Sequence, residues 1–248
     1  METIMRMLTR GGMMCNMETN GRITGLSGNQ LKLIALIAMT VDHVGMLLFP
    51  YEAWFRVVGR LAFPIFAYMI GEGCAYTRHR GRYIGKMAGL ALACQIVYYL
   101  FMDSLYQCVL VTFSLSVGLA LLLNNAMKRS GIANWLLVVF GVAAVYFLTE
   151  ILPGLLSGTD YGVDYGFFGV LLPVAVYMGK TRQQKFVFFS LGAAVLAAGY
   201  GGIQWYSLLA LPLLMLYNGQ RGKAKLKNLF YIYYPAHLVA IYAIGLIV

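Results

Sequence analysis

Three ionisable residues stand out from their apolar surroundings: Asp42, His43 and Arg60. A neutral imidazole can take a proton from an attacking amine or hydroxyl, which is general base catalysis. A guanidinium can stabilise the oxyanion that forms during acyl transfer, or it can bind a phosphate. The same residue types also build proton relays in transporters. The three residues therefore predict either acyl transfer or proton-coupled transport.

Asp42 and Arg60 lie at similar depths of neighbouring apolar segments, so they can form an ion pair. Asp and Arg near the centre of a membrane helix oppose insertion by about 5–7 kcal/mol together, unless they meet each other or water. Adjacent helical residues point about 100° apart, so Asp42 and His43 face different neighbours. Two interpretations stay open: a structural Asp42–Arg60 pair beside a hydrogen-bonded histidine, or a reactive site in which all three residues are catalytic.

The last apolar segment places a proline between two further candidates, Tyr234 and His237. Pro235 lacks an N–H group and frees the carbonyl of Tyr231. A broken helix at membrane depth is tolerated where it packs within protein or lines a wet cavity. His237 then either bonds that carbonyl or binds substrate. Tyr234 belongs either to an interfacial aromatic belt or to a substrate wall.

Two carboxylates lie near the ends of apolar segments. Glu72, between two glycines, either pairs with the basic loop that begins at Arg78 or has a functional role. Asp164 lies in a loop with the repeated pattern Asp-Tyr-Gly, in which glycine supplies tight turns. Asp164 is therefore either part of a solvated turn or a group that attracts an amine-bearing substrate.

These candidates lie in a chain whose composition predicts an all-α, multi-pass membrane protein. Of its 248 residues, 60% are hydrophobic and 11% are charged, against about 45–50% and about 25% in soluble domains. The apolar runs are continuous over about 20 residues rather than alternating, which favours helices over a β-barrel. They predict nine transmembrane helices, near residues 31–49, 57–76, 84–102, 106–126, 132–152, 165–179, 186–201, 203–217 and 229–248.

Positive charge is distributed unevenly among the loops. With nine spans, seventeen of the nineteen Lys and Arg residues lie on one side, and the exceptions are Arg56, interpreted as a loop residue, and Arg60. The positive-inside rule then places the N-terminus in the cytoplasm and the C-terminus outside. The net charge of +10 thus reflects topology rather than a nucleic-acid partner. Residues 1–30 are predicted to be a flexible cytoplasmic segment, and 31–248 a single transmembrane domain.

Signatures of metal or nucleotide-driven chemistry are missing from the sequence. The four cysteines have no metal-ligand spacing, and the chain contains no HExxH motif, Walker loop or dinucleotide-binding glycine pattern. We therefore expect no metal cofactor and no ATP-driven pumping.

Five motifs follow one another along the chain after residue 30. The first runs from Leu31-Lys32-Leu33-Ile34-Ala35 to Asp42-His43-Val44-Gly45, and the others cover 59–67, 164–172, 217–222 and 230–238. The second begins Gly59-Arg60-Leu61, and the last contains Tyr234-Pro235-Ala236-His237. In their residues and order these motifs resemble the TraX family of polytopic membrane proteins.

The resemblance implies an acyltransferase of the bacterial cytoplasmic membrane that moves acetyl groups across the membrane or onto its outer face. The family's namesake acetylates the N-terminus of conjugative pilin. The implied co-substrate is acetyl-CoA, and the acceptor would be a pilin-like N-terminus or an envelope glycan. Asp42, His43, Arg60 and His237 fall on characteristic positions of the family pattern.

The residues then suggest a path for the acetyl group. His43 is the expected base, with Asp42 as its partner and Arg60 at the oxyanion or at a donor phosphate. Basic residues on the cytoplasmic side would hold the CoA phosphates, while the acyl arm threads inward and the acceptor enters near Asp164. These basic residues are Arg78, Arg82, Arg221 and Lys223. A covalent acetyl-histidine is an alternative intermediate.

Two other classes of function fit the same residues. A proton-coupled transporter would use the intramembrane Asp, His and Arg as a relay, with the proline-broken helix at its substrate site. A structural membrane subunit would tolerate alanine at Asp42, His43 and Arg60 together. Turnover of acetyl-CoA separates the first prediction from both alternatives.

Overall fold

The computed structural model describes residues 25–77, 79–129, 131–223 and 227–245. Within these residues the chain is helical, and its β-type pairings are two isolated bridges. The elements are α2 (Gly28–Leu48), α3 (Ala53–Gly59), α4 (Ala62–Tyr76), α5 (Arg80–Met102), α6 (Val109–Lys128), α7 (Ile132–Tyr146), the π-helix η1 (Phe147–Ile151), α8 (Leu152–Leu155), α9 (Gly166–Met178), α10 (Arg182–Tyr200), the 3₁₀-helix η2 (Gly202–Leu209), α11 (Ala210–Met215) and α12 (Lys227–Gly245).

Two helix starts are set by capping boxes, in which a hydroxyl and a glutamine satisfy backbone N–H groups that the helix leaves free. At the start of α2, the hydroxyl of Ser27 accepts from the backbone of Gln30, whose side chain accepts from Ser27 N–H. Thr181 and Gln184 repeat this arrangement at α10. The cap explains why α2 begins at Gly28, three residues before the predicted segment.

Five stretches of helix are long and apolar enough to cross a membrane: α2, α3 with α4, α5, α6, and α7 through α8. Shorter apolar helices cover 166–178, 202–215 and 232–245. Each of the nine predicted segments overlaps a described helix. The helices of the sixth and eighth segments are short, as predicted, whereas α10 at the seventh has 19 residues. The all-helical membrane character is therefore confirmed in the described residues, while the count of nine spans stays a prediction.

Besides the π-helix η1 in the fifth predicted segment, two of the predicted segments have irregular backbone where the sequence predicts a continuous α-helix. The second segment breaks between α3 and α4, at Arg60 and Leu61. The eighth segment begins with η2, a 3₁₀-helix of eight residues that follows two glycines with positive φ. Runs of 3₁₀-helix this long are uncommon, because their hydrogen-bond geometry is poorer than that of an α-helix. Both irregular stretches border the outer polar cluster described below.

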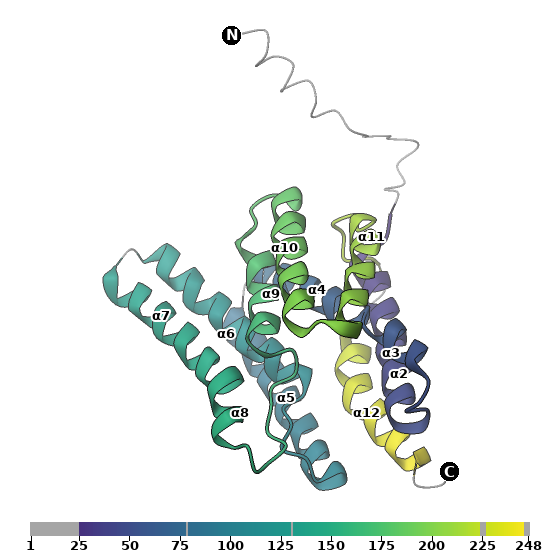
Figure 1. Cartoon of the computed structure of the whole chain (residues 1–248). Helices are drawn as coiled ribbons and strands as arrows, with labels where there is room; N and C mark the ends of the chain where they lie inside the picture. Colours follow the sequence, from purple (N-terminus) through teal and green to yellow (C-terminus); the bar gives the residue numbers. More distant parts are fainter. Residues whose placement is uncertain (1–24, 78, 130, 224–226, 246–248) are drawn as a thin grey trace.

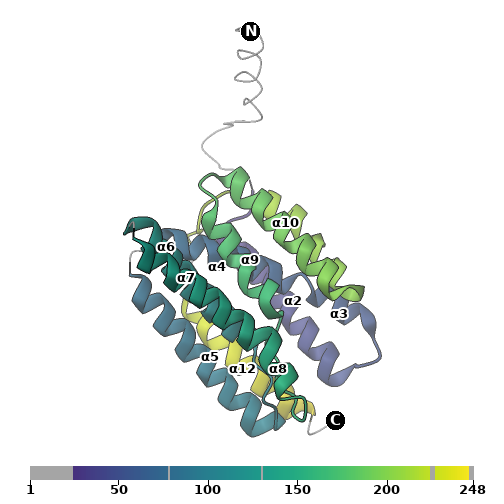
Figure 2. The same ribbon diagram turned by 60° about the vertical axis from the view of Figure 1, so that its left-hand side comes forward.

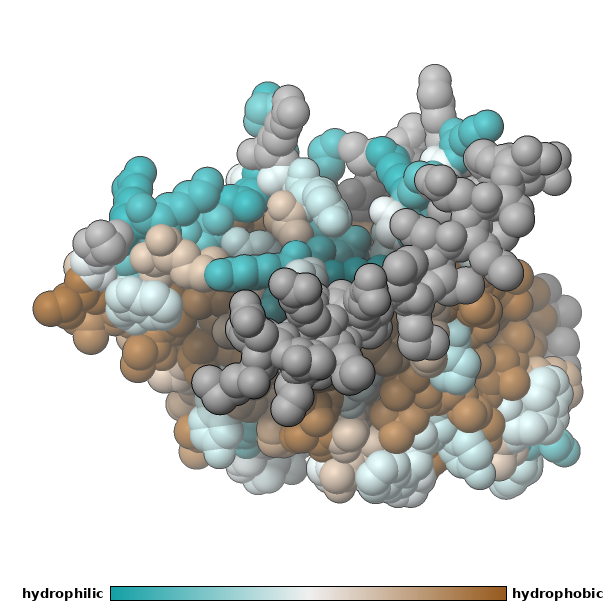
Figure 3. Space-filling model, turned by 90° about the horizontal axis from the view of Figure 1, so that it is seen from above, coloured by the Kyte–Doolittle hydropathy of each residue, from teal (hydrophilic) through white to brown (hydrophobic). Residues whose placement is uncertain are grey.

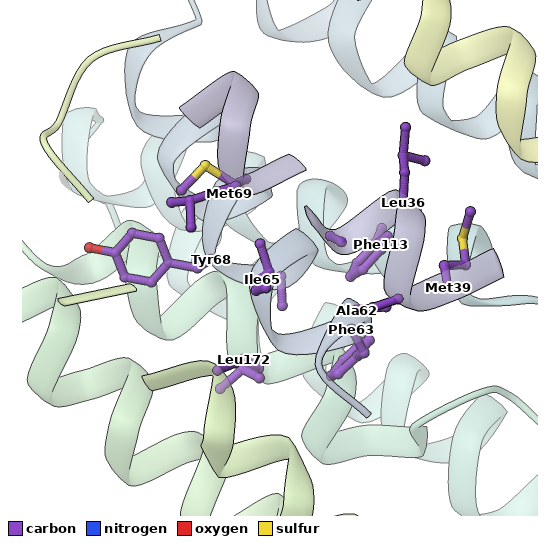
Figure 4. Packing of buried hydrophobic residues seen from close by; sticks show 14 of the residues in the cluster. Leu36, Met39, Ala62, Phe63, Ile65, Tyr68, Met69, Phe113 and Leu172 are labelled. Carbon is purple, nitrogen blue, oxygen red and sulfur yellow. The ribbon is translucent and has the colours of Figure 1, made fainter. Parts of the chain in front are cut away.

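The core is built around α4. Its Ile65 and Tyr68 are almost fully buried, and Phe63 stacks on Phe113 from α6, as the packing in Figure 4 shows. Gly71 lets α4 approach α9 closely, since a Cβ there would lie 2.5 Å from the carbonyl oxygen of Pro173. α4 therefore packs in the centre of the bundle, between α2, α6 and α9.

The outer helices leave large apolar side chains uncovered. On α7, Leu136 and Phe140 are mostly exposed, and Leu92 and Leu100 of α5 are similar. Such continuous exposed apolar surface is rare on soluble monomers and suits the lipid interior. α2 begins and α12 ends at opposite ends of the bundle (Figure 1).

Positive side chains gather at the end where α2 begins, which we call the basic end and define by Lys32, Arg82, Lys86 and Arg221. Figure 3 views the molecule from this end. Hydrophilic residues cross the upper and middle part of the view, and hydrophobic residues follow its side and lower margins. The charged end and the apolar sides are arranged as expected for a protein that crosses a membrane.

Candidate functional site

A pair of histidines joins the first and last described helices. Nδ1 of His43 on α2 lies 3.2 Å from Nε2 of His237 on α12, and the two rings meet edge to face. His43 Nδ1 also lies 2.9 Å from the carbonyl oxygen of Met39. His237 Nδ1 lies 3.0 Å from the carbonyl oxygen of Tyr233. The fold thus brings together two residues that are 194 positions apart.

These contacts assign a tautomer to each neutral ring, because a carbonyl oxygen only accepts hydrogen bonds. His237 carries its proton on Nδ1 and donates it to Tyr233, which leaves Nε2 as an acceptor. His43 carries its proton on Nδ1, facing both Met39 and His237. The lone pair on Nε2 of His43 has no hydrogen-bond partner among the described residues. It is therefore the ring atom available as a base.

Aromatic side chains enclose the histidine pair on the α12 side. The ring of Tyr233 stacks on His237, and its hydroxyl lies 2.6 Å from the hydroxyl of Thr40. Tyr234 is buried and meets His237 edge to face at 5.5 Å between ring centroids. The prediction that His237 bonds the carbonyl of Tyr231 is wrong: it bonds the carbonyl of Tyr233, one turn before it.

A second cluster, formed by Asp42, Arg56 and Arg60, lies on the neighbouring face of α2. We call it the outer cluster. The Asp42 carboxylate accepts from Arg56 Nη1 at 2.7 Å and lies 3.7 Å from Arg60 Nη2. The prediction that Asp42 and His43 face different neighbours is confirmed, since one contacts α3 and the other α12. The Asp42–Arg60 pair is present but long. Arg56, interpreted as a loop residue, lies on α3 and is the closer partner.

Two features hold this outer cluster together. Any side chain at position 59 would collide with Asp42, so Gly59 allows α2 and α3 to approach closely. Arg60 Nη1 donates to Gln204 Oε1 at 3.1 Å, which ties the α3–α4 break to η2. Gln204 was not among the predicted site residues. A polar side chain within an apolar segment is the signal that could have found it.

Asp164 lies at the edge of the outer cluster, in the loop before α9. The hydroxyl of Tyr106 donates to its carboxylate at 3.4 Å. Burial raises the pKa of Asp164 to about 6, and Asp42 adds to this effect while Arg60 and Arg56 oppose it. The predicted alternative, a solvated turn, instead describes Asp160, whose exposed carboxylate accepts from Ser104 and from the backbone of Leu105.

A large cavity opens at the basic end. It has a volume of about 680 Å³, and its lining includes Lys32, Arg82, Lys86 and Arg221. A smaller adjoining cavity of about 150 Å³ shares Lys32 and Arg221 with it. The smaller cavity has mainly apolar walls and reaches Tyr234, the tyrosine that contacts His237. The two cavities therefore lead from a charged opening toward the histidine pair.

Backbone pairing positions Arg221 at this opening. The N–H groups of Gly28 and Asn29 donate to the carbonyls of Gln220 and Arg221, at 2.7 and 3.0 Å. This pairing holds the loop before α12 against the start of α2. Of the other predicted basic residues, Arg82 lines the large cavity, Lys223 is exposed and does not line it, and Arg78 lies outside the described residues.

Glu72, which lines the large cavity, belongs to a buried ion pair. Lys185 on α10 donates to Glu72 on α4, and both side chains are about nine-tenths buried. The hydroxyl of Tyr217 donates to the other carboxylate oxygen of Glu72 at 3.4 Å. Lys185 is therefore the ion-pair partner of Glu72 in the described chain, and no described residue of the loop that begins at Arg78 pairs with it. Over the described ranges, no three His, Cys, Asp or Glu side chains converge to hold a metal ion.

Comparison with known proteins places these features in a family. A family model described as TraX protein matches residues 27–245. The probable fimbrial assembly protein FimC, serogroup H1, of Dichelobacter nodosus is 25% identical over 86% of this chain and 93% of its own length. The Protein TraX sequences of Escherichia coli and its strain K12 are 28% and 30% identical over 68% of this chain, which covers 63% of each. No solved structure matches the chain.

Proposed function

The chain belongs to the TraX family, and from this premise we propose that it is a membrane acyltransferase. It would move an acetyl group from cytoplasmic acetyl-CoA to an amine or hydroxyl at the outer side of a bacterial cytoplasmic membrane. One observation carries the proposal. A cavity with a cationic opening adjoins an apolar extension that ends at Tyr234, and Tyr234 contacts a histidine pair in which Nε2 of His43 has no partner among the described residues.

The chemistry of the two cavities supports a CoA thioester as the donor. Lys32, Arg82, Lys86 and Arg221 line the opening, where they would hold the phosphates of CoA. The apolar extension, whose walls include Leu36 and Phe113, would take the acyl arm. Along α2, His43 lies about 16 Å beyond Lys32. The thioester would therefore react in the outer half of the membrane.

The proposed reaction uses His43 as general base. Nε2 of His43 takes the proton of the acceptor amine or hydroxyl while its nitrogen or oxygen attacks the acetyl carbonyl. The new C–N or C–O bond forms, the C–S bond breaks, and the proton passes from His43 to the thiolate, which leaves as CoA thiol. His237 Nε2 accepts from Nδ1–H of His43 and so stabilises the imidazolium, as the third group does in other triads.

Asp42 takes a different role from the one expected for the partner of the base, whereas Arg60 keeps its expected role. Asp42 is bound to Arg56, away from His43, so His237 and the Met39 carbonyl orient the imidazole in its place. We propose that Asp42 is a positioning residue that holds Arg60. The guanidinium of Arg60 then provides positive charge in the outer half, where the oxyanion or an anionic part of the acceptor would be stabilised.

The proposed topology has nine spans, with the N-terminus in the cytoplasm and the C-terminus outside. It is supported by the position of the basic end, where α2 begins, and by α12 ending at the opposite end. The acceptor would approach from that opposite end, near Asp164. A pilin-like N-terminus is one candidate, and an envelope glycan is another. The name of the Dichelobacter relative, a probable fimbrial assembly protein, supports the first.

Acetyl-CoA turnover by the purified protein tests the proposal. In detergent, with labelled acetyl-CoA and an envelope extract as acceptor, His43→Ala should lower turnover at least 100-fold, the low end for loss of a general base. Thr149→Ala is a matched control, because it also removes a buried hydrogen bond within a membrane helix but lies on η1, away from the site. A folded His43→Ala protein with wild-type turnover would refute the proposed base.

The same experiment without acceptor separates two mechanisms. Labelled acetyl trapped on His43 would indicate a covalent acetyl-histidine in place of direct transfer. No label on the protein, with full turnover when acceptor is added, would indicate general base catalysis.

The histidine pair also favours one competing function, proton-coupled transport. The hydrogen bond from His43 to His237 could pass a proton between two helices. Proton-dependent flux into proteoliposomes without consumption of acetyl-CoA would favour a transporter. Turnover that is independent of any proton gradient would favour the acyltransferase.

A further inference from the structure

Three buried hydrogen-bond donors without partners lie at the α3–α4 break and on η2, which packs against α3 and α4. They are Nε of Arg60, Nε2 of Gln204 and Oγ of Ser207, and none has a partner among the described residues. Gln204 is 4% exposed and Ser207 is 1% exposed. Three residues make one turn of a 3₁₀-helix, so both side chains lie on the same face of η2. We call these three donors, together with Asp42, the outer recess.

Such a cluster is unusual because buried polar groups are normally satisfied. A donor left unpaired in an apolar environment costs about 1–3 kcal/mol, and the membrane interior offers no water in exchange. The backbone on both sides of the recess is irregular as well: α3 stops at Gly59, and η2 is a 3₁₀-helix. At membrane depth, irregular backbone is typical of sites that bind a substrate or line a cavity.

The chemistry of the recess selects its ligand. Arginine only donates, so the bond from Arg60 to Gln204 fixes the amide oxygen on that side and leaves the amide N–H groups free. Arg60 uses Nη1 for this bond, while its Nε is unpaired and its Nη2 has only the 3.7 Å contact with Asp42. One edge of the guanidinium is thus open. Guanidinium edges bind phosphate and carboxylate groups through two parallel hydrogen bonds.

The charges around the recess agree with an anionic ligand. Asp42 is committed to Arg56 at 2.7 Å, so its charge only weakly compensates Arg60. A further carboxyl, that of Asp164, accepts a hydrogen bond from Tyr106. The recess contains one unpaired acceptor, Asp42 Oδ1, against three unpaired donors. A ligand with several acceptor oxygens would satisfy the recess better than a neutral hydroxyl or an ammonium group.

We infer that the outer recess binds an anionic oxygen group, a phosphate or a carboxylate, of the acceptor substrate. Because Asp42 directly precedes His43 on α2, a group held at Arg60 lies on the helix face next to the imidazole. An amine or hydroxyl elsewhere on the same molecule would then reach Nε2 of His43. Binding at the recess stands by itself, whereas the role as acceptor site rests on the proposed acyltransferase function.

Two serine-to-alanine variants with equal burial test the recess. Ser207 and Ser116 are each 1% exposed, but Ser116 donates to the carbonyls of Thr112 and Val170 while Ser207 has no partner in the described chain. Without ligand, Ser116→Ala should lower the Tm in detergent, because it leaves two buried carbonyls with fewer donors. Ser207→Ala should keep or raise the Tm, because it removes an unsatisfied group.

The response to added anions should then differ in the opposite way: Ser116→Ala should keep the anion effect on Tm, and Ser207→Ala should lose much of it. At constant ionic strength, inorganic phosphate or acetate should raise the Tm of the wild-type protein and of Ser116→Ala. In Ser207→Ala and in Gln204→Leu, the affinity for the same anion should fall roughly 10-fold or more, as expected for the loss of one charge-assisted hydrogen bond. If Ser207→Ala lowers the Tm as much as Ser116→Ala and leaves the anion effect unchanged, the inference is wrong.

Mixed micelles distinguish the sources of the anionic group. Phosphatidylglycerol tests a lipid headgroup, and an uncharged galactolipid with the same chains is its control. A Tm rise with phosphatidylglycerol beyond that with inorganic phosphate assigns a lipid headgroup, and equal rises assign a soluble phosphate. A rise with acetate alone assigns a carboxylate. No rise with any of these probes overturns the inference.

The outcome for the recess is independent of the outcome for the enzyme. Anion binding that depends on Ser207 and Gln204, without acetyl-CoA turnover, would keep the site and refute the acyltransferase. Turnover with an acceptor KM that is unchanged in Gln204→Leu would keep the enzyme and refute the recess as its acceptor site. In the expected result, the acceptor KM rises about 10-fold in Gln204→Leu, and the KM for acetyl-CoA does not change.

Discussion

The two sides of the histidine pair differ in how ready they are to receive a ligand. The basic end holds an open cavity of about 680 Å³ with exposed cationic side chains. The outer recess is enclosed, and its three donors have no hydrogen-bond partners in the described chain. Open cations in water cost little, whereas enclosed and unpaired donors are costly. The basic end is therefore preformed, and the outer recess gains its stability only when a ligand satisfies it.

For the proposed acyltransferase, this difference explains how the protein would separate its two substrates. A preformed opening binds its ligand without reorganisation. A recess of buried, unpaired donors favours a molecule that supplies several acceptor oxygens at once. On this view the basic end sets affinity for the donor, and the outer recess sets selectivity for the acceptor. Three changes would sharpen or break this comparison.

The largest expected effect is the loss of stability when the ion pair at the basic end is broken, compared with the pair beside the outer recess. Glu72→Gln leaves Lys185 charged and buried without its partner, which typically costs about 3–5 kcal/mol. For a chain of this size that lowers the Tm by roughly 6–20 °C. Arg56→Gln removes a pair that is partly exposed, so it should cost about 1 kcal/mol or less. Thermal unfolding in detergent measures both.

A double variant is the control for this prediction. Glu72→Gln with Lys185→Met removes the pair as a unit and should recover most of the lost stability, since no buried charge remains. Equal Tm losses for Glu72→Gln and Arg56→Gln would mean that the two pairs are buried alike, and the contrast between the two sides would fail.

A smaller effect is expected on donor binding. Arg221→Ala removes one cation from the opening, so the KM for acetyl-CoA should rise about 10-fold, as for the loss of one charge-assisted contact. Added salt should weaken donor binding by the wild-type protein more than by the variant. Lys223→Ala is a matched control, because Lys223 is exposed nearby but does not line the cavity. A raised acceptor KM in Arg221→Ala would show that the two sides are not separate.

The smallest effect concerns pH. The raised pKa of Asp164, about 6, means that the folded protein holds this proton more tightly than the unfolded chain does. Its contribution to the free energy of unfolding therefore falls as the pH rises from about 4 to about 6. Asp164→Asn should remove this slope from a series of Tm measurements across that range.

Asp160, in the same loop, should change the stability with pH in the opposite direction. Hydrogen bonds from Ser104 and the backbone of Leu105 lower its pKa, so its contribution to stability falls as the pH drops below about 4. Asp160→Asn should leave the slope between pH 4 and 6 in place. If Asp164→Asn also leaves it, Asp164 is not buried against the outer cluster in solution.

The sequence correctly predicted those features of the site that depend on the geometry of a single helix. The divergence of Asp42 and His43 follows from helical periodicity alone, and it is found. The proline at 235 marked α12 as an unusual helix, yet the carbonyl that His237 bonds was wrongly predicted as that of Tyr231. The reason is local: the imidazole reaches back one turn to the carbonyl of Tyr233, whether or not a proline has freed another.

The main errors concerned contacts between residues that lie far apart in the sequence. Glu72 was matched to the nearest cationic loop, but Lys185 lies more than a hundred residues away and packs against it. Arg56 reads as a loop residue because the apolar segment starts after it, although α3 begins at Ala53. Gln204 and Ser207 stand alone among apolar residues, and their relation to Arg60 depends on how η2 packs on the α3–α4 break.

The amino-acid sequence by itself determined that this protein is helical and lies in a membrane, because apolar length and charge placement act on each segment independently. It also determined which residues are costly enough in that environment to require a purpose. Only the tertiary structure decided which of them meet. The His43–His237 pair and the recess of unpaired donors join helices far apart in the chain, and such contacts depend on packing between surfaces that no single segment specifies.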